Sequence, residues 1–345
     1  MKAPAGIQPI LPGATIGLLG GGQLGRMTAL AARSMGYKVA VLDPDPHCAA
    51  SPLADTVIVG AFDDAEAARR LARRSAVVTY EIECIAPAVL RAVAECVPLR
   101  PGAHVLECIQ DRARQKCWLA DHGYPVGPWR DVAEQGLQLQ LELSVLVARS
   151  PQGSVVAHPP AANWHDDGVL QFSLFPAPIP VALARKATEL AKALSVDLGV
   201  EGLLAVELFV TPEGRLLVNE LSPRPHNTFH AAGAACATGQ FEQYVRAICG
   251  LPLGSTETLG SSVLVNLLGD LWLGPQPQLE AALAIPGVSL HLYGKEPRPL
   301  RKVGHLTVCG ATAAQALSRA EAAVAVLEPH VATTPRPEPR IPSAS

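Results

Sequence analysis

Apolar runs of strand length alternate with amphipathic stretches over the first hundred residues. The runs lie at 15–20, 38–42, 55–60 and 76–81, and short continuous runs of this kind are typical of strands buried on both faces. Between them, 23–35 and 63–74 repeat apolar positions every three to four residues, with Asp63 or Asp64 at the expected start of the second helix. Strands alternating with helices predict a parallel sheet with right-handed crossovers.

The pattern changes after residue 100. A helix is predicted at about 105–121, and the apolar segments from 143 to 170 read as antiparallel strands with a turn at 151–153. An amphipathic helix follows at 181–198, then a hairpin at 203–221 and a helix at 240–250. Beyond residue 255 the alternation predicts a small α+β cap with a helix at 311–327. The fold class is therefore α/β in several domains.

Composition narrows the class of protein. The formal net charge is −3 and no basic stripe stands out, so we expect no nucleic acid as a partner, and a small molecule instead. No apolar run reaches the roughly 18 residues of a membrane span, so we expect no membrane contact. The eight cysteines form no C-x-x-C pair and suit reduced thiols in a cytoplasmic protein.

The hairpin at 203–221 carries two acidic residues. With the turn centred on 212–213, Glu207 faces Val218, and Glu220 lies two positions further on the same face. Diagonal neighbours of this kind are about 7–8 Å apart, so the two carboxylates could share Mg²⁺ bound to nucleotide phosphates. A one-residue bulge would place one of them on the other face. Two solvent-exposed acids would give the same pattern.

Two further segments carry candidate chemistry. After the hairpin, Arg224 could bind a planar oxyanion, and His226 beside Asn227 could donate a proton. A histidine held in the core is the alternative. The second segment is a proline-interrupted loop suited to a phosphate or carboxylate, unless it is only a solvated surface run. Its basic residues are Lys295, Arg298, Arg301, Lys302 and His305.

A glycine loop follows the first predicted strand. Gly20, Gly22 and Gly25 have the G-x-G-x-x-G spacing, and Asp43 ends the next strand. This is the fingerprint of a dinucleotide-binding dehydrogenase. The free N–H groups at the helix start after Gly22 would favour a bound anion.

The segments GLLGGGQLGRM, VTYEIE, QDRARQK, HDDGVL, VELFVTPEGRLLVNELSPRPHN and KEPRPLRKVGH occur in this order between about residues 15 and 330. Together they resemble the N5-carboxyaminoimidazole ribonucleotide synthase family of ATP-grasp carbon–nitrogen ligases. The resemblance implies an N-terminal Rossmann-like parallel-sheet domain (1–104), an ATP-grasp α+β domain (105–255) and a small, β-rich C-terminal α+β domain (256–330). A disordered tail is expected at 331–345.

The resemblance also implies an activity. Family members use bicarbonate and MgATP to carboxylate the amine of aminoimidazole ribonucleotide through carboxyphosphate, and they commonly form homodimers. The glycine loop would then face the ribonucleotide instead of NAD, and the spacing of Asp43 would be a coincidence.

Roles carry over residue by residue from this resemblance. The metal positions are Glu207 and Glu220. The ATP-contacting positions are Arg112, Glu142, His165, Asn219 and Glu220. The catalytic positions, which handle bicarbonate and carboxyphosphate, are Arg224, His226, Asn227 and Lys295. The positions that receive the ribonucleotide are Gln23, Arg301 and Lys302.

The sequence departs from the family in one interval. Before Glu142 the family has a small subdomain that supplies an ATP-binding lysine and a glycine-rich flap. This chain has only AEQGLQLQL at 133–141, with no lysine from 117 to 185, and Leu141 in place of the family's arginine. Loss of the lysine and flap predicts weaker ATP binding and less protection of carboxyphosphate from water.

Three functional hypotheses follow. The first is the ligase, with activity reduced by the missing subdomain. The second is a catalytically impaired family member that binds the ribonucleotide without ATPase activity. The third is a dehydrogenase, which leaves the carboxylate hairpin unexplained. A related ligase, the formate-dependent glycinamide ribonucleotide transformylase, fits the EIE and KEPRPLRKVGH segments less well.

Overall fold

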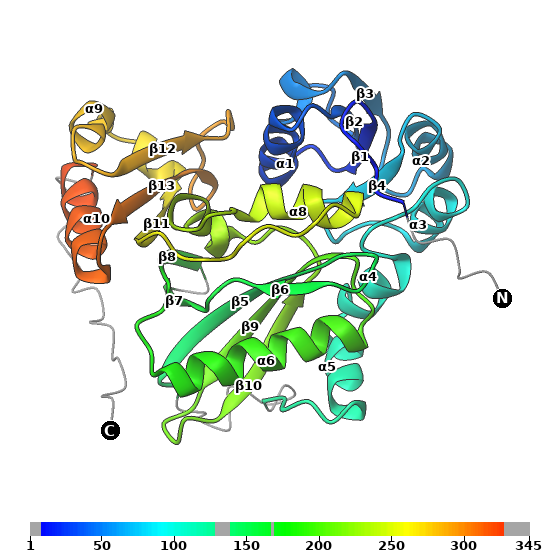
Figure 1. The fold of residues 1–345 in the computed structure, drawn as a ribbon. Coiled ribbons are helices and arrows are strands. Elements are labelled where there is room, and N and C mark those ends of the chain that lie inside the picture. Colours follow the sequence, from blue (N-terminus) through cyan, green and yellow to red (C-terminus); the bar gives the residue numbers. More distant parts are fainter. Residues whose placement is uncertain (1–7, 128–138, 167–168, 328–345) are drawn as a thin grey trace.

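The computed structural model describes residues 8–127, 139–166 and 169–327. An N-terminal α/β unit, a central unit with one long helix along its sheet and a C-terminal unit follow one another in Figure 1. None of the helices in these ranges is long and apolar enough to cross a membrane. The predicted tail at 331–345 and most of the interval at 133–141 lie outside the described residues.

The N-terminal unit is the predicted parallel sheet, with strand order β3-β2-β1-β4. Its strands are β1 (Thr15–Leu19), β2 (Lys38–Asp43), β3 (Thr56–Val59) and β4 (Val77–Tyr80). Its helices are α1 (Gln23–Ser34), α2 (Ala65–Ala72) and α3 (Pro87–Ala94), with a short 3-10 turn at Ser51–Leu53. Asp64 is the N-cap of α2, since its side chain accepts from two backbone N–H groups.

The segment predicted as one helix at 105–121 forms two, α4 (Ala103–Ile109) and α5 (Arg112–Asp121). The single-helix prediction was wrong because Asp111 caps α5, accepting from the backbone N–H of Arg114. Gln110, at the break, donates to the carbonyls of Glu83 and Ile85. The break thus ties the start of α5 to the loop after β4.

A nine-stranded sheet spans the central and C-terminal units in the described residues, in the order β10-β9-β5-β7-β8-β11-β13-β12, with β6 paired to β5. The central strands are β5 (Leu141–Arg149), β6 (Val155–Ala157), β7 (Ala161–Asp166), β8 (Val169–Phe175), β9 (Gly202–Val210) and β10 (Leu216–Ser222). The C-terminal strands are β11 (Ser261–Leu268), β12 (Val288–Leu292) and β13 (Lys302–Gly310). The predicted cap therefore continues the central sheet through the β8–β11 pairing.

Helices cover this sheet. The amphipathic helix predicted at 181–198 is α6 (Val181–Asp197), which packs against β5 and β9. The others are α7 (Ala232–Ala235), α8 (Gln240–Cys249), α9 (Leu279–Leu283) and α10 (Ala313–Leu327), with 3-10 turns at Asn227–His230 and Gly269–Trp272.

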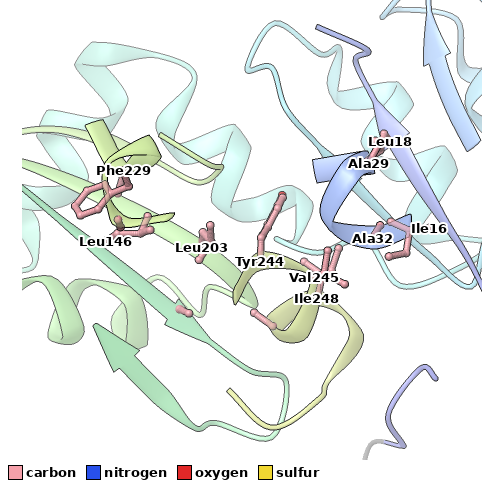
Figure 2. Packing of buried hydrophobic residues seen from close by; sticks show 14 of the residues in the cluster. Ile16, Leu18, Ala29, Ala32, Leu146, Leu203, Phe229, Tyr244, Val245 and Ile248 are labelled. Atoms are coloured by element: carbon pink, nitrogen blue, oxygen red, sulfur yellow. The ribbon is translucent and has the colours of Figure 1, made fainter. Parts of the chain in front are cut away.

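Helix α8 joins the N-terminal unit to the large sheet. Figure 2 shows Tyr244, Val245 and Ile248 of α8 between residues of α1 and β1 on one side and Leu203 and Leu146 on the other. The Tyr244 hydroxyl hydrogen bonds to the Thr79 hydroxyl and donates to the carbonyl of Tyr80 (3.2 Å). Each such large buried side chain contributes about 1.5–3 kcal/mol. This packing places the end of β4 beside the end of β10.

Candidate active site

Strands β9 and β10 pair differently from the predicted register. Val218 lies opposite Leu208, the register then shifts, and Glu220 lies directly opposite Glu207. The prediction that Glu207 faces Val218 was therefore wrong by one residue. A bulge at Asn219 then moves Glu220 along by one residue. A bulge was expected to separate the two carboxylates, but here it brings them onto one face.

Glu207 is held from two sides. Its Oε1 lies 3.2 Å from His226 Nε2, and its Oε2 accepts from Asn219 Nδ2 at 3.2 Å. Burial raises the pKa of Glu207, but the hydrogen bond and charge of His226 outweigh it, so that the pKa lies below its usual range. Glu207 is thus kept as a carboxylate.

Glu220 has the opposite environment. Burial raises its pKa, and the charges of Glu207 and Glu83 raise it further. Arg112 Nη1 lies 3.5 Å from Glu220 Oε2, and Arg112 Nη2 donates to Asn219 Oδ1 at 3.2 Å. The predicted neighbours of the nucleotide on α5 and β10 therefore meet in one place.

The carboxylate pair suits a hard divalent cation bound with a nucleotide. No group of three or more His, Cys, Asp or Glu side chains suited to a metal occurs in the part of the chain that the structure describes. Mg²⁺ in phosphate-binding sites needs only one or two carboxylates, with phosphates and water completing its shell. The repulsion that raises the pKa of Glu220 is also what such a cation would relieve. The residues present fit Mg²⁺.

Glu142 of β5 and His165 of β7 form the next part of the site. His165 Nδ1 lies 2.6 Å from Glu142 Oε2. The hydrogen bond to Glu142 raises the pKa of His165, and the charge of Glu207 adds to the rise. Two predicted ATP contacts are thus one ion pair within electrostatic range of the carboxylate hairpin.

Arg224 is oriented by Glu83, a residue that sequence reasoning missed. Arg224 Nε lies 2.9 Å from Glu83 Oε1, which also accepts from the Ser222 hydroxyl at 3.2 Å. The signal was present in the sequence, because Glu83 is the second glutamate of VTYEIE. Only the meeting of β4 and β10 shows which cation it pairs with.

Gln23 connects three distant parts of the chain. Its Nε2 donates to Asn227 Oδ1 at 2.9 Å, and its Oε1 accepts from Lys295 Nζ at 2.9 Å. Burial lowers the pKa of Lys295, and the charge of Arg301 lowers it further. The predicted ribonucleotide and bicarbonate residues therefore lie next to each other.

Lys302 is a buried amine whose Nζ has no hydrogen-bond partner within the described ranges. Burial, followed by the charge of Lys295, lowers its pKa to about 7. Arg301 instead donates to the carbonyl of Glu296 in its own loop at 3.1 Å. Lys302 Nζ is therefore buried without a partner in the described residues, while Arg301 is held in its own loop.

Three stacked imidazoles lie in the electrostatic neighbourhood of Lys302. His230 stacks on His305 with ring centroids 4.2 Å apart, and His305 on His291 at 4.7 Å. Burial, then the charges of His291 and Lys302, lower the pKa of His305 to about 2. Burial thus favours the uncharged form of these rings, an arrangement that the sequence pattern did not indicate.

The glycine loop is already filled by the protein's own carboxylates. Glu81 accepts from the backbone N–H groups of Gly22 (2.7 Å) and Gly25 (3.1 Å), and Asp43 accepts from that of Gly21 (2.7 Å). The N–H groups of Gly22 and Gly25, which were expected to favour an external anion, instead donate to the Glu81 carboxyl group. Three N–H groups that a pyrophosphate would need are therefore already bound to side chains of the protein, which argues against the dehydrogenase hypothesis. Asp43 has a structural role in the loop.

Comparison with known proteins identifies the family. Family models match as the ribonucleotide synthetase preATP-grasp domain (13–110), the ATP-grasp domain (109–241) and the phosphoribosylaminoimidazole carboxylase C-terminal domain (262–319). The N5-carboxyaminoimidazole ribonucleotide synthase of Bacillus subtilis is 37% identical, over 87% of this chain and 92% of the relative. The chain belongs to the N5-carboxyaminoimidazole ribonucleotide synthase family. It is an ATP-grasp ligase.

Other members agree. The synthase of Brucella melitensis biotype 1 is 36% identical, over 86% of this chain and 96% of the relative. A crystal structure of an ADP complex of N5-carboxyaminoimidazole ribonucleotide synthetase superposes with a TM-score of 0.87 and 36% sequence identity. The match covers 92% of this chain and 98% of that one. The structure of the Aspergillus clavatus enzyme with ADP and 5-aminoimidazole ribonucleotide superposes with a TM-score of 0.84 and 28% sequence identity. The match covers 92% of this chain and 99% of that one.

The N5-carboxyaminoimidazole ribonucleotide synthase family thus accounts for the order of the three units, and its coverage argues against a member that only binds ligand. The Bacillus subtilis alignment extends over 356 positions, more than the 345 residues of this chain. It therefore contains positions to which this chain contributes no residue.

Proposed function

We propose that the protein catalyses the ATP-dependent carboxylation of 5-aminoimidazole ribonucleotide with bicarbonate to N5-carboxyaminoimidazole ribonucleotide. The observation that carries the proposal is the continuous series of polar groups from the carboxylate pair to Gln23. Glu207 contacts His226, and Asn227 one residue further contacts Gln23, which binds Lys295. Nucleotide, bicarbonate and ribonucleotide positions thus adjoin.

The nucleotide end holds ATP through Arg112, Glu142, His165, Asn219 and Glu220. Arg112 is 62% exposed on its side chain, so it can turn from Glu220 to a phosphate. Glu207 and Glu220 would hold Mg²⁺, which would supply charge neutralisation for the phosphates. Keeping Glu207 ionised, as His226 does, prepares the pair for that cation.

The next step belongs to Arg224, His226, Asn227 and Lys295. A bicarbonate oxygen attacks the γ-phosphorus of ATP, and the bond to ADP breaks, giving carboxyphosphate. Arg224, fixed by Glu83, offers a planar pair of donors to the carboxyl oxygens. The His226 ring, fixed through Glu207, orients the transferred phosphate.

Gln23, Arg301 and Lys302 would hold the ribonucleotide at the other end. Its exocyclic amine attacks the carboxyl carbon, phosphate leaves, and the amine loses one proton. Lys302 lacks a partner of its own in the described residues and therefore suits the ribonucleotide phosphate. The backbone of the glycine loop positions Gln23 at the start of α1.

The short interval before β5 bears on the affinity for ATP. We assign the domains 1–104, 105–255 and 256–330, with the flap subdomain absent near 133–141. Residues 117–185 contain no lysine to neutralise phosphates from that side. Loss of one electrostatic donor can cost on the order of 10²–10³ in rate. The dissociation constant of MgATP is expected to lie above the low micromolar range, and calorimetric titration would measure it.

A phosphate-release assay tests the proposal. Wild-type protein with MgATP and bicarbonate is expected to release phosphate in a ribonucleotide-dependent manner and to transfer ¹³C from bicarbonate to the ribonucleotide, which NMR detects. Binding of the ribonucleotide without any release would favour the ligand-binding alternative. A homodimer and a cytoplasmic location also belong to the proposal, and light scattering of the purified protein checks the first.

A further inference from the structure

Two buried side chains of α5 lie along the outer edge of β10. Gln115 and Lys116 are each 3% exposed. Lys116 Nζ donates to the carbonyls of Val218 (2.9 Å) and Asn219 (2.5 Å). Gln115 binds both backbone groups of Leu221, donating to its carbonyl (3.3 Å) and accepting from its N–H (3.2 Å). These side chains thus make hydrogen bonds that a neighbouring strand would otherwise make.

The position of these contacts on β10 is specific. β10 is the outermost strand of its sheet among the described strands, and an outermost strand needs other partners for its outer row of N–H and C=O groups. The Val218 N–H donates to the carbonyl of Pro125 (2.7 Å), and Gln115 and Lys116 bind other groups of this row. Lys116 binds the carbonyls of the last residue before the register shift and of the bulged residue itself. Gln115 binds the strand just after it. The two side chains therefore grip both sides of the bulge.

The bulge decides where Glu220 points. If the pairing of Val218 with Leu208 continued without a shift, Asn219 would face Glu207, and Glu220 would face Val206 on the opposite side of the sheet. A bulge disrupts ladder hydrogen bonds and needs other partners for the groups it frees. Lys116 supplies one for the Asn219 carbonyl, and Arg112 of the same helix donates to the Asn219 side chain.

We infer that Gln115 and Lys116 are positioning residues, which hold the β10 bulge and thereby set Glu207 opposite Glu220 for a divalent cation. The inference rests on the proposed function in one respect, namely that this carboxylate pair binds the metal. Neither side chain touches a reacting group. Both act through the backbone of β10.

The test measures metal binding instead of turnover. Wild-type and Lys116→Met proteins are titrated with Mn²⁺ alone, and free Mn²⁺ is followed by electron paramagnetic resonance. Met keeps the length of the side chain but removes its donors, so the Mn²⁺ dissociation constant is expected to rise at least fivefold. The matched control is Lys192→Met on α6, where the lysine is paired only with Glu189 in the described residues. Its Mn²⁺ affinity is expected to equal that of the wild type.

Circular dichroism and thermal unfolding accompany each titration. A Lys116→Met protein with lowered thermal stability but unchanged Mn²⁺ affinity would overturn the inference, since Lys116 would then be only a core contact. If wild-type protein binds no Mn²⁺ at millimolar concentration, the metal site of the proposed function fails and the inference fails with it. If Lys116→Met does not fold, Lys116→Gln, which retains an amide donor, replaces it. The Mn²⁺ dissociation constant of this variant is expected to rise at least twofold. Unchanged affinity there would equally overturn the inference.

Discussion

At the residue scale, the two opposed carboxylates have opposite environments. His226 and Asn219 stabilise Glu207 as an anion, while burial and two neighbouring carboxylates disfavour the anion of Glu220. Separating the pKa values of paired groups in this way is how proteins assign different roles to chemically identical side chains. In the proposed metal site, Glu207 would thus be the anchored ligand, and Glu220 carries a charge repulsion that a bound cation would relieve.

Substitution of each glutamate by glutamine is expected to shift stability in opposite directions at pH 7. Glu207→Gln loses a favoured anion and should cost about 1–2 kcal/mol. Glu220→Gln removes a repelled anion and should raise the melting temperature by about 1 °C, little because that side chain is 40% exposed and screened by solvent. Thermal unfolding from pH 4 to 8 measures both.

The pH dependence of the stability follows from the directions of the two pKa shifts. The lowered pKa of Glu207 gives stability that is present above the ordinary glutamate pKa and is lost as pH falls through the lowered value. The raised pKa of Glu220 has the opposite effect on stability. Its contribution to stability is present below the ordinary glutamate pKa and is lost as pH rises through the raised value. The gain from Glu220→Gln should therefore vanish at pH 4. A gain that persists there would contradict the assignment.

At the element scale, the loop between β1 and α1 is built around Glu81. Its carboxylate lies where a dinucleotide-binding loop would hold a phosphate, and it accepts from two N–H groups of the loop. A Cβ on Gly22 would lie 2.5 Å from Glu81 Oε1, and one on Gly25 would lie 2.7 Å from the carbonyl oxygen of Gly20. The glycine spacing therefore serves close packing around an internal carboxylate.

Gly25→Ala is expected to destabilise the protein by about 1–3 kcal/mol, because the new methyl group meets backbone that cannot move aside cheaply. Gly233→Ala on α7 is the control, since a Cβ there meets nothing within 4 Å, and it should change stability by less than about 0.5 kcal/mol. Denaturant unfolding compares the two. Equal stabilities of the two variants would show that the loop can accommodate a methyl group at Gly25.

At the scale of the whole molecule, the site depends on contacts between residues far apart in the chain. Gln23 and Lys295 are 272 positions apart and meet at 2.9 Å. Helix α8 makes this possible by packing the N-terminal unit against the large sheet (Figure 2). The ribonucleotide end thus depends on domain packing and lies apart from the interval before β5.

The ribonucleotide is accordingly expected to bind without ATP. Lys302→Ala should weaken this binding on the order of tenfold, since a buried ammonium–phosphate contact is lost. Glu207→Gln serves as the comparison and should leave it nearly unchanged. Calorimetry at two salt concentrations should also show affinity falling as salt rises. No heat at millimolar ribonucleotide would contradict the assignment of this end.

Ribonucleotide affinity should also depend on pH. The pKa of Lys302 is lowered to about 7, and only the ammonium form attracts phosphate, so affinity should fall as pH rises from 7 to 8.5. In Lys302→Ala the same pH change should have a much smaller effect. An equal fall in both proteins would assign the titration to another group.

Much of the local structure can be predicted from the sequence. Its apolar periodicity placed the four parallel strands and the long helix α6, and its capping signal narrowed the cap of α2 to Asp63 or Asp64, because burial and capping are local. Its motifs also selected the residues that meet at the site. Only the folded chain shows the register of β10, the pairing of Glu83 with Arg224 and the position of the Glu81 side chain in the glycine loop. These depend on a single bulge and on packing between segments distant in sequence, and no local pattern of residues encodes either.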